Sequence, residues 1–151
     1  MDLLALKKQV LEIGMSLIES KMAGLHAEMK NFQAAANNET KSSAGDKYET
    51  GRAMMQLEKD KVASLLGQLD KQKKVLGEIN PTQSHETVRL GSIVMTDNGC
   101  FYLSVSLGKL SASQDVFCIS PVSPLGQAML GKKAESTAEF NGRKYHIQSV
   151  A

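Results

Sequence analysis

The side chains best suited to covalent or metal chemistry in this sequence are two cysteines and three histidines. Cys100 and Cys118 lie far apart among apolar neighbours, without the C-x-x-C spacing of a redox or zinc motif. A nucleophilic cysteine needs a histidine or another base beside it, but His26, His85 and His146 fall on three different expected segments. We therefore expect two buried, reduced thiols and no enzyme with an active site of its own.

Charge and composition indicate a globular protein. The chain has 151 residues, of which 42% are hydrophobic and 23% charged, and its net charge is +2. Lys and Arg number 12 against 11 Asp and Glu up to Asn80, and 6 against 5 after it, so neither part has the basic excess that binds phosphate backbones. No apolar run reaches the ~18 residues of a membrane span, and no signal peptide is recognisable, so we expect a cytoplasmic protein.

A seven-residue apolar repeat predicts one long helix over residues 2–36. A leucine, isoleucine or phenylalanine recurs at every seventh position, and a methionine or alanine follows most of them four positions later. These two series are typical of the a/d seam of a coiled coil. Further apolar residues widen the seam in the first half only, so we expect that end to pack against a second domain. The two series are Leu4, Leu11, Ile18, Leu25 and Phe32, and Met15, Met22, Met29 and Ala36.

A second helix of the same period follows after a turn. Apolar residues recur at every seventh position from Tyr48 to Leu76, and the helix is expected to end at Asn80-Pro81 because proline disfavours helical geometry in the residue before it. The segment "NNETKSSAGD" between the helices has the composition of a turn. Two helices of roughly equal length can pair antiparallel, so we expect a hairpin over residues 1–80 with its tip at 37–47.

After Pro81 the pattern changes to short strands around tight turns. Runs of β-branched and aromatic residues flank Asp97-Asn98-Gly99. Two alternating runs flank Asn141-Gly142, the strongest short hairpin signal in a sequence. Together with the run "QDVFCIS", these segments predict about five strands in a small antiparallel sheet.

One short helix is expected within this strand-rich part, over residues 124–130. Ser123 is its N-cap, proline occupies the first helical position, and Gly131 ends it. The predicted fold class is therefore α+β. A long antiparallel coiled-coil hairpin (residues 1–80) is followed by a small antiparallel sheet domain with one short helix (residues 81–151).

The segment "SPVSPLGQAMLGKK", residues 120–133, resembles the C-terminal signature of the Gre family of bacterial transcript-cleavage factors (GreA/GreB type). That signature has serine, two variable residues, Ser-Pro, an aliphatic residue, alanine or glycine, any residue, a small residue, two aliphatic residues and, after one more, a basic residue. The expected order of elements is similar too, so the resemblance covers nearly the whole chain. The matching positions are Ser120, Ser123, Pro124, Leu125, Gly126, Ala128, Met129, Leu130 and Lys132.

The resemblance implies a bacterial transcription elongation factor that binds RNA polymerase. In the family, the C-terminal domain is FKBP-like, without isomerase activity, and docks at the rim of the polymerase's secondary channel. The coiled coil would then reach down the channel and regulate transcription elongation. We expect a monomer that meets nascent RNA only inside the polymerase complex and does not bind membranes. By this resemblance the polymerase-binding residues are Ser120, Ser123, Pro124, Leu125 and Gly126.

The chemistry of the family lies at the hairpin tip. Two acidic side chains there help to hold a second Mg²⁺ beside the polymerase's own carboxylates, and this metal activates water to cut backtracked RNA. The isolated protein would hold no cofactor or metal and would at most stimulate the polymerase's intrinsic cleavage. This sequence departs from the family's tip, because an ungapped alignment puts Lys41 and Ala44 at the two acidic positions. The remaining candidates for catalytic residues are the nearby carboxylates Glu39, Asp46 and Glu49.

Two other functions fit the same patterns. A non-enzymatic coiled-coil adaptor would use the hairpin to bind another protein, and a polymerase inhibitor would use the Gre fold without cleavage activity. In both cases the three tip carboxylates would be ordinary solvated charges. The lysines at the base of the second helix could form a local RNA-contacting patch, although the small net charge favours a solvated face. These lysines are Lys71, Lys73 and Lys74.

Overall fold

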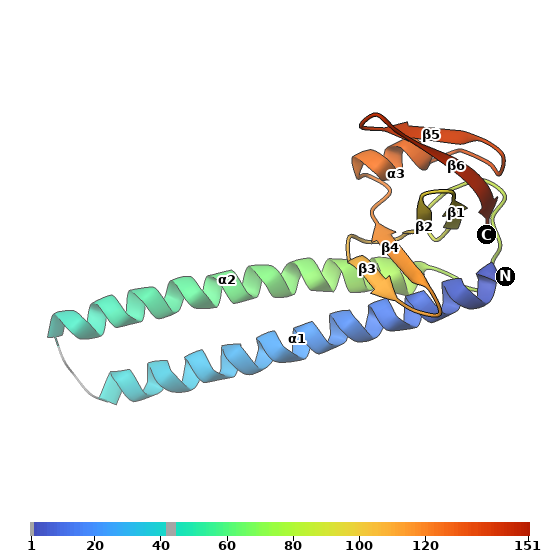
Figure 1. Ribbon diagram of the computed structural model, residues 1–151. Helices are drawn as coiled ribbons and strands as arrows, with labels where there is room; N and C mark the ends of the chain where they lie inside the picture. Colours follow the sequence, from blue (N-terminus) through green and yellow to red (C-terminus); the bar gives the residue numbers. More distant parts are fainter. Residues whose placement is uncertain (1, 42–44) are drawn as a thin grey trace. The chain divides into compact units, whose positions relative to one another are not determined.

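The computed structural model describes residues 2–41 and 45–151, and the side chains of residues 2–35 and 51–151. Within this part of the chain it contains two long helices, a six-stranded sheet and one short helix (Figure 1). The fold class is therefore α+β, as predicted. The elements are α1 (Leu3–Lys41), α2 (Gly45–Glu78), β1 (Ile93–Thr96), β2 (Gly99–Leu103), β3 (Gly108–Ser111), β4 (Asp115–Ile119), α3 (Pro124–Met129), β5 (Thr137–Phe140) and β6 (Arg143–Val150).

The chain forms two compact units. The hairpin unit is Leu17–Lys73. The sheet unit combines Met1–Ser16 with Lys74–Ala151, so it includes the first turns of α1 and the last turns of α2. The two units are defined by how closely their residues pack together, not by function. They do not test the expected domains, residues 1–80 and 81–151, which therefore stay predictions.

In the hairpin unit α1 and α2 run antiparallel, side by side (Figure 1). Lys73 Nζ of α2 lies 3.9 Å from Glu19 Oε1 of α1, so later turns of α2 face earlier turns of α1. Burial follows the predicted seam, with steps of three and four residues between the positions that are not exposed. Between residues 18 and 35 these are Ile18, Met22, Leu25, Met29, Phe32 and Ala35, and between 51 and 69 they are Gly51, Met55, Lys59, Val62, Leu66 and Leu69.

Both long helices extend into the segment whose composition predicted a turn. α1 continues to Lys41 and α2 begins at Gly45. Asparagine, serine and glycine lower helix propensity by about 1 kcal/mol or less each, and the segment contains no proline to stop a helix. Residues 42–44 of the predicted tip lie outside the described part of the chain.

The sheet has the strand order β3-β4-β2-β1-β6-β5. Its neighbouring strands are antiparallel except for β2 and β4, which are parallel. The expected sheet of about five antiparallel strands is thus a mixed sheet with one more strand, β3. The sequence "GKLS" of β3 has no run of β-branched residues, and only Leu110 in it is buried. β3 is the edge strand of the sheet and pairs with β4, the strand that follows it in the chain. After β2 the chain therefore forms the edge strand first and then returns to form β4 between β3 and β2.

Both predicted tight turns are present in the sheet. Phe140 pairs with Arg143 across the two-residue turn Asn141-Gly142, whose φ angles are 54° and 77°. Two successive left-handed residues are typical of a type I′ turn, which matches the twist of the flanking strands. Asp97-Asn98 joins β1 to β2, and Gly99 after it has a φ of 125°, a conformation that favours glycine.

The core of the sheet unit is formed between α3 and the sheet. Met129 of α3 has no exposed surface, and the ring of Phe101 meets the ring of Tyr145 edge-on, with centroids 5.6 Å apart. Each large side chain buried here stabilises the fold by about 2 kcal/mol. The core therefore fixes α3 firmly on the sheet. Its buried residues are Val88, Val94, Phe101, Leu103, Met129, Ala138, Tyr145 and Ile147.

The first turns of α1 pack on the rest of the sheet unit, as the widened apolar face of that end predicts. A Cβ at Gly14 would lie only 3.1 Å from Leu107 Cδ1, so glycine lets the helix approach closely. The backbone N and the Oγ of Ser113 both donate to Gln9 Oε1, at 3.1 and 3.0 Å. Leu6 and Val10, on the same stretch of helix, are buried.

Candidate docking surface and hairpin tip

The segment that resembles the Gre signature folds as a tight loop that leads into α3. Ser123 is the N-cap residue, with an extended backbone (φ −67°, ψ 156°), and its Oγ accepts from the backbone N of Gly126 at 3.1 Å. The same hydroxyl donates to the backbone O of Ser120 at 2.6 Å. Ser120 Oγ accepts from the backbone N of Val122 at 3.2 Å. The two serines therefore fix the loop and the first turn of the helix together, as the predicted N-cap requires.

Gly126 is required by close packing and not by an unusual backbone angle. It is buried in the first turn of α3. A Cβ there would overlap the carbonyl oxygen of Ser120 and would lie 3.0 Å from Ser123 Oγ and 3.1 Å from the carbonyl carbon of Pro121. The family signature allows alanine or glycine at this position, but in this chain only glycine fits beside the loop.

The end of α3 is tied to the strand-rich part of the sheet unit. Gly131 has a φ of 80° and donates its backbone N–H to the carbonyl of Val88 at 2.9 Å. The backbone N of Val88 donates in turn to the carbonyl of Lys132 at 2.9 Å. The predicted glycine stop is confirmed, because only a left-handed residue turns the chain at this point. Both ends of the short helix are thus held in place.

The loop and α3 present an uncharged surface to solvent. Val122 is 79% exposed, the most exposed large apolar side chain in the described part of the chain. Pro124 and Gln127 are exposed beside it, whereas Leu125 is half-buried and packs against the core. The sequence of α3, PLGQAM, has no charged residue. An exposed apolar side chain on a hydrogen-bonded loop without charged residues has the properties of an interface anchor.

The five residues chosen from the signature therefore divide into three groups. Ser120, Ser123 and Gly126 hold the loop in shape, Leu125 packs against the core, and Pro124 is exposed at the surface. Val122 occupies a variable position of the signature, so the sequence comparison did not select it. Val122 is selected by its exposure to solvent, which only the folded structure shows.

The three tip carboxylates lie on the long helices. Glu39 is in α1, and Asp46 and Glu49 are in α2. Their side chains lie outside the described residues, so their role as metal ligands stays a prediction. In the part of the chain with described side chains, no three His, Cys, Asp or Glu residues are grouped so that they could hold a metal ion.

Both cysteines are buried, free thiols, as predicted. Cys100 lies in β2 and Cys118 in β4, each with 3% of its surface exposed. Burial raises the pKa of each thiol to about 11, so both are protonated at neutral pH. A protonated, enclosed thiol is a poor nucleophile. These cysteines therefore fill the core of the sheet unit.

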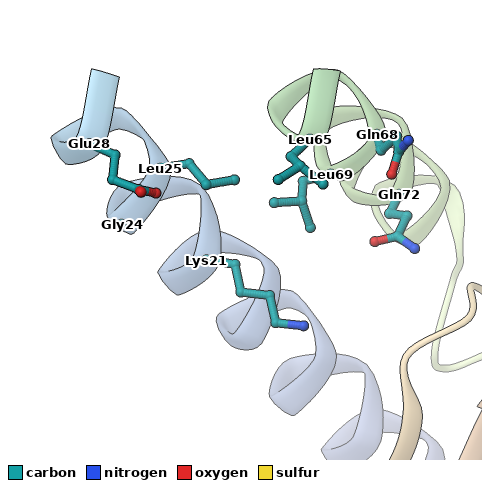
Figure 2. A pocket seen from close by; sticks show the side chains of 8 residues that line it. All are labelled: Lys21, Gly24, Leu25, Glu28, Leu65, Gln68, Leu69 and Gln72. Atoms are coloured by element: carbon teal, nitrogen blue, oxygen red, sulfur yellow. The ribbon is translucent and has the colours of Figure 1, made fainter. Parts of the chain in front are cut away.

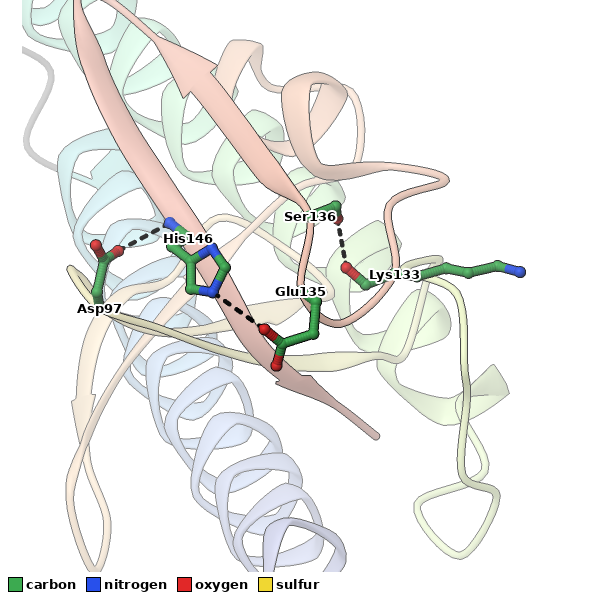
Figure 3. Close-up of polar contacts among 5 residues, drawn as sticks. All are labelled: Asp97, Lys133, Glu135, Ser136 and His146. Atoms are coloured by element: carbon green, nitrogen blue, oxygen red, sulfur yellow. Dashed lines mark hydrogen bonds and ion pairs between the residues drawn. The ribbon is translucent and has the colours of Figure 1, made fainter.

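His146 takes part in contacts that hold β6 to its neighbours (Figure 3). Its backbone N donates to Asp97 Oδ1 at 2.8 Å, and its ring Nε2 lies 3.5 Å from Glu135 Oε2. Nearby, Ser136 Oγ donates to the backbone carbonyl of Lys133. These contacts join the turn before β2 to the segment before β5, and they involve no cysteine.

A buried lysine joins α1 to the segment that follows α2. Lys7 has no exposed surface, and its Nζ donates to the backbone O of Gln83 at 2.6 Å. Burial, with the positive charge of Arg89 as a second cause, lowers the pKa of Lys7 to about 8. Burial, together with Lys7 and Arg89, also lowers the pKa of His85 to about 4, and its Nδ1 lies 2.7 Å from Ser92 Oγ. We therefore expect the stability of this junction to depend on pH.

Comparison with known proteins leaves the family of this chain open. No family model matches the sequence, and no curated protein matches it. Two similar solved structures are GreA factor homolog 1 (Gfh1) of Thermus thermophilus and a second structure described as the transcription factor Gfh1. The first is 16% identical, has a TM-score of 0.35 and covers 86% of this chain and 94% of that chain. The second is 17% identical, has a TM-score of 0.36 and covers 91% and 92%. Likenesses at this level establish neither a shared fold nor a shared function.

None of the helices in the described part of the chain has the length and apolarity that spanning a membrane requires.

Proposed function

We propose that this protein is a transcription factor of the bacterial cytoplasm that binds RNA polymerase through the loop before α3 and the exposed side of α3. The observation that carries the proposal is the segment "SPVSPLGQAMLGKK". It resembles the Gre signature in sequence, and it forms a tightly held loop with an exposed apolar side chain, Val122. The resemblance suggests the partner, and the geometry suggests which atoms contact it.

The held loop would favour binding to a large partner. Ser120, Ser123 and Gly126 fix the backbone before any partner arrives, so little conformational entropy is lost on binding. Val122 and Pro124 can then be buried in a partner's pocket without removing a charge from water. Ser120, Ser123 and Gly126 act as positioning residues, and Val122 and Pro124 act as contact residues.

The finer proposal is that the hairpin enters the secondary channel of the polymerase and regulates elongation. α2 has 34 residues, which corresponds to about 50 Å at a rise of 1.5 Å per residue. Glu39, Asp46 and Glu49 would supply oxygen ligands to a Mg²⁺ shared with the polymerase active site, and the polymerase would perform the cleavage. The alternatives are a polymerase inhibitor, which binds without supplying ligands, and a non-enzymatic adaptor, which binds another protein.

The first experiment measures binding to purified bacterial RNA polymerase. Val122→Asp should weaken binding at least tenfold, because a charge replaces an apolar anchor at the interface. Leu90→Asp is the matched control, since Leu90 is an apolar residue of the same unit, 41% exposed, outside the loop and α3. Equal binding of wild type and Val122→Asp would contradict the docking surface. No binding of the wild type would contradict the polymerase proposal and favour the adaptor.

The second experiment tests the tip with backtracked polymerase complexes. Glu39→Ala, Asp46→Ala and Glu49→Ala are each compared with wild type for Mg²⁺-dependent shortening of the RNA. Loss of shortening in one variant, with binding retained, identifies a metal ligand. Binding by the wild type without shortening would leave a polymerase inhibitor whose tip lacks the chemistry.

A further inference from the structure

A groove lies between α1 and α2 in the hairpin unit, and the proposed function makes no use of it (Figure 2). Its volume is about 570 Å³. On α1 its wall is formed by Lys21, Gly24, Leu25 and Glu28, and α2 supplies a wall with the same spacing. Residues three, four and seven apart share one face of a helix, so both helices line the groove with a single face.

The floor of the groove is apolar and open to solvent. Leu25 of α1 points toward Leu65 and Leu69 of α2 (Figure 2). Leu65 is 43% exposed, and a Cβ at Gly24 would meet no atom within 4 Å. The centre of the α1 wall therefore has an empty space where a side chain would normally stand. A surface of this shape can accept a side chain from another helix.

The charges on the α1 wall are arranged symmetrically about this space. Lys21 and Glu28 are seven residues apart, about 10 Å along the helix, which is too far for them to pair with each other. Neither has an ion-pair partner among the described side chains. Their midpoint lies between Gly24 and Leu25. A twofold axis through that point, perpendicular to the helix, would place a second copy antiparallel to the first. Lys21 of each copy would then lie against Glu28 of the other.

The same axis would also bring apolar atoms together. Leu25 of each copy would lie over Gly24 of the other, so that a large side chain fills the empty space. This arrangement needs no change in the backbone, because both residues already line the groove. Charge pairing and packing therefore require one and the same axis.

α2 satisfies this symmetry as well. One groove is lined by both walls, so α1 residues 21–28 and α2 residues 65–72 lie at about the same level along the hairpin. The midpoint of the α2 wall falls between Gln68 and Leu69. A single axis can therefore relate both helices to a second copy. Leu65 would then be covered by the side chain of the second copy's Gln72.

We propose that the hairpin unit pairs with a second copy of this chain across this groove, as an antiparallel four-helix dimer held by two Lys21–Glu28 ion pairs. Helices in such bundles pack at about 20° to one another, an angle that two straight hairpins can adopt. The proposal goes beyond polymerase binding and does not depend on it. It departs from the monomer expected from the sequence. If both proposals hold, the dimer covers one side of the hairpin and keeps it from entering a channel.

Charge reversal on the full chain tests the proposal by sedimentation equilibrium from low micromolar to submillimolar concentration. The wild type should dimerise. Lys21→Glu and Glu28→Lys should each weaken the dimer about tenfold or more, because two attractive pairs become two repulsive ones. The double variant, Lys21→Glu with Glu28→Lys, should restore dimerisation. Lys30→Glu is the matched control, since it makes the same charge change on the opposite side of α1.

A second variant separates loss of the dimer from loss of folding. Gly24→Leu fills the space that Leu25 of the second copy would occupy, yet its Cβ meets nothing within a single copy. It should abolish the dimer without lowering the midpoint of thermal unfolding, because leucine has a higher helix propensity than glycine. A wild type that stays monomeric throughout, or a double variant that fails to recover, would overturn the proposal. A monomer that binds another protein's helix in this groove would overturn it too.

Discussion

The sheet unit and the hairpin unit bury their apolar residues in different ways. In the sheet unit Val94, Met129 and Ile147 have no exposed surface, and the core includes side chains from α3 and several strands. In the hairpin unit only Ile18 and Val62 are buried among the side chains that the structure describes. Met54 and Leu57 of α2 remain 64% and 69% exposed.

The difference follows from the number of neighbours that each element has. A two-helix hairpin removes one stripe of each helix from water, whereas a sheet covered by helices encloses its core from several sides. The sheet unit can therefore hold the loop before α3 in a fixed shape. The hairpin unit instead leaves apolar surface and a groove exposed to water.

Glycine to alanine substitutions should change stability most, and the change should be opposite in the two units. Gly126→Ala should destabilise the sheet unit by about 3 kcal/mol, because the added methyl group overlaps the Ser120 carbonyl. Gly24→Ala should instead stabilise the hairpin by up to about 1 kcal/mol, since its Cβ meets nothing. Urea unfolding followed by circular dichroism measures both. A Gly126→Ala variant as stable as wild type would contradict the close packing of the loop.

Removal of the buried charge at Lys7 should change how stability depends on pH. The folded pKa of Lys7, about 8, is lower than its ordinary value of 10.5, so the unfolded chain binds more protons between these two values. Stability should therefore rise from pH 8 to 10.5, by about 3 kcal/mol at most. Lys7→Met should remove this rise, because no buried amine remains to lose its proton.

The control for this variant is Lys8→Met, which changes the exposed neighbouring lysine. Its unfolding free energy should show the same rise with pH as that of the wild type. Urea titrations at pH 7, 8, 9 and 10.5 give the profiles. Profiles of the same shape for wild type and Lys7→Met would show that the amine of Lys7 is not desolvated in the folded state.

Valine to alanine substitution compares the two cores directly. Val94→Ala should cost about 2 kcal/mol, because several elements enclose the site and leave a cavity, whereas Val62→Ala should cost about 1 kcal/mol, because the open seam can relax. Hydrogen exchange of the amides in each unit reports the two losses separately. Equal losses would mean that the hairpin seam is as tightly packed as the sheet core.

Loss of the cap on α3 should have a smaller effect that stays within the docking loop. Ser123→Ala removes the acceptor for the N–H of Gly126 and the donor to Ser120, which costs about 1 kcal/mol. Ser123→Asp keeps the acceptor and should recover part of the loss. Thermal unfolding measures stability, and faster exchange of the Gly126 amide locates the change. An unchanged exchange rate in Ser123→Ala would show that the cap does not hold the helix.

The smallest effect is expected at the surface ion pair of the hairpin. Lys73 and Glu19 are both about half exposed and 3.9 Å apart, so Lys73→Met should cost at most about 0.5 kcal/mol. The loss should shrink further in high salt, where exposed charges are screened. A loss that does not depend on salt would indicate that the aliphatic part of Lys73, rather than its charge, stabilises the hairpin.

Local patterns in the sequence predicted the elements whose formation depends on neighbours in the chain. The two seven-residue series, one with Leu25 and the other with Met22 and Met29, predicted the seam. Asn141-Gly142 predicted a two-residue hairpin turn that the structure confirms. Ser123 and Gly131 predicted the two ends of α3. Each of these signals acts within a few residues, where propensity and hydrogen bonding decide the conformation.

Other features depended on contacts between distant segments and left no local pattern. β3 pairs with β4 although its sequence has only one buried residue, Leu110, and the parallel pairing of β2 with β4 follows from that detour. The exposure of Val122 could not be predicted from the sequence, because it depends on all the atoms that surround the side chain. The predicted roles of Glu39, Asp46 and Glu49 stay predictions.

The sequence by itself determined the period of the two long helices, the tight turns of the sheet and the caps of α3, because these depend on the conformations that each residue and its near neighbours allow. Only the tertiary structure decided that Gly126 must be glycine, that Lys7 is a desolvated charge and that Lys21, Gly24 and Glu28 line a symmetric groove. Each of those properties depends on atoms brought close by folding, from the far side of a loop, from another element or from the facing helix.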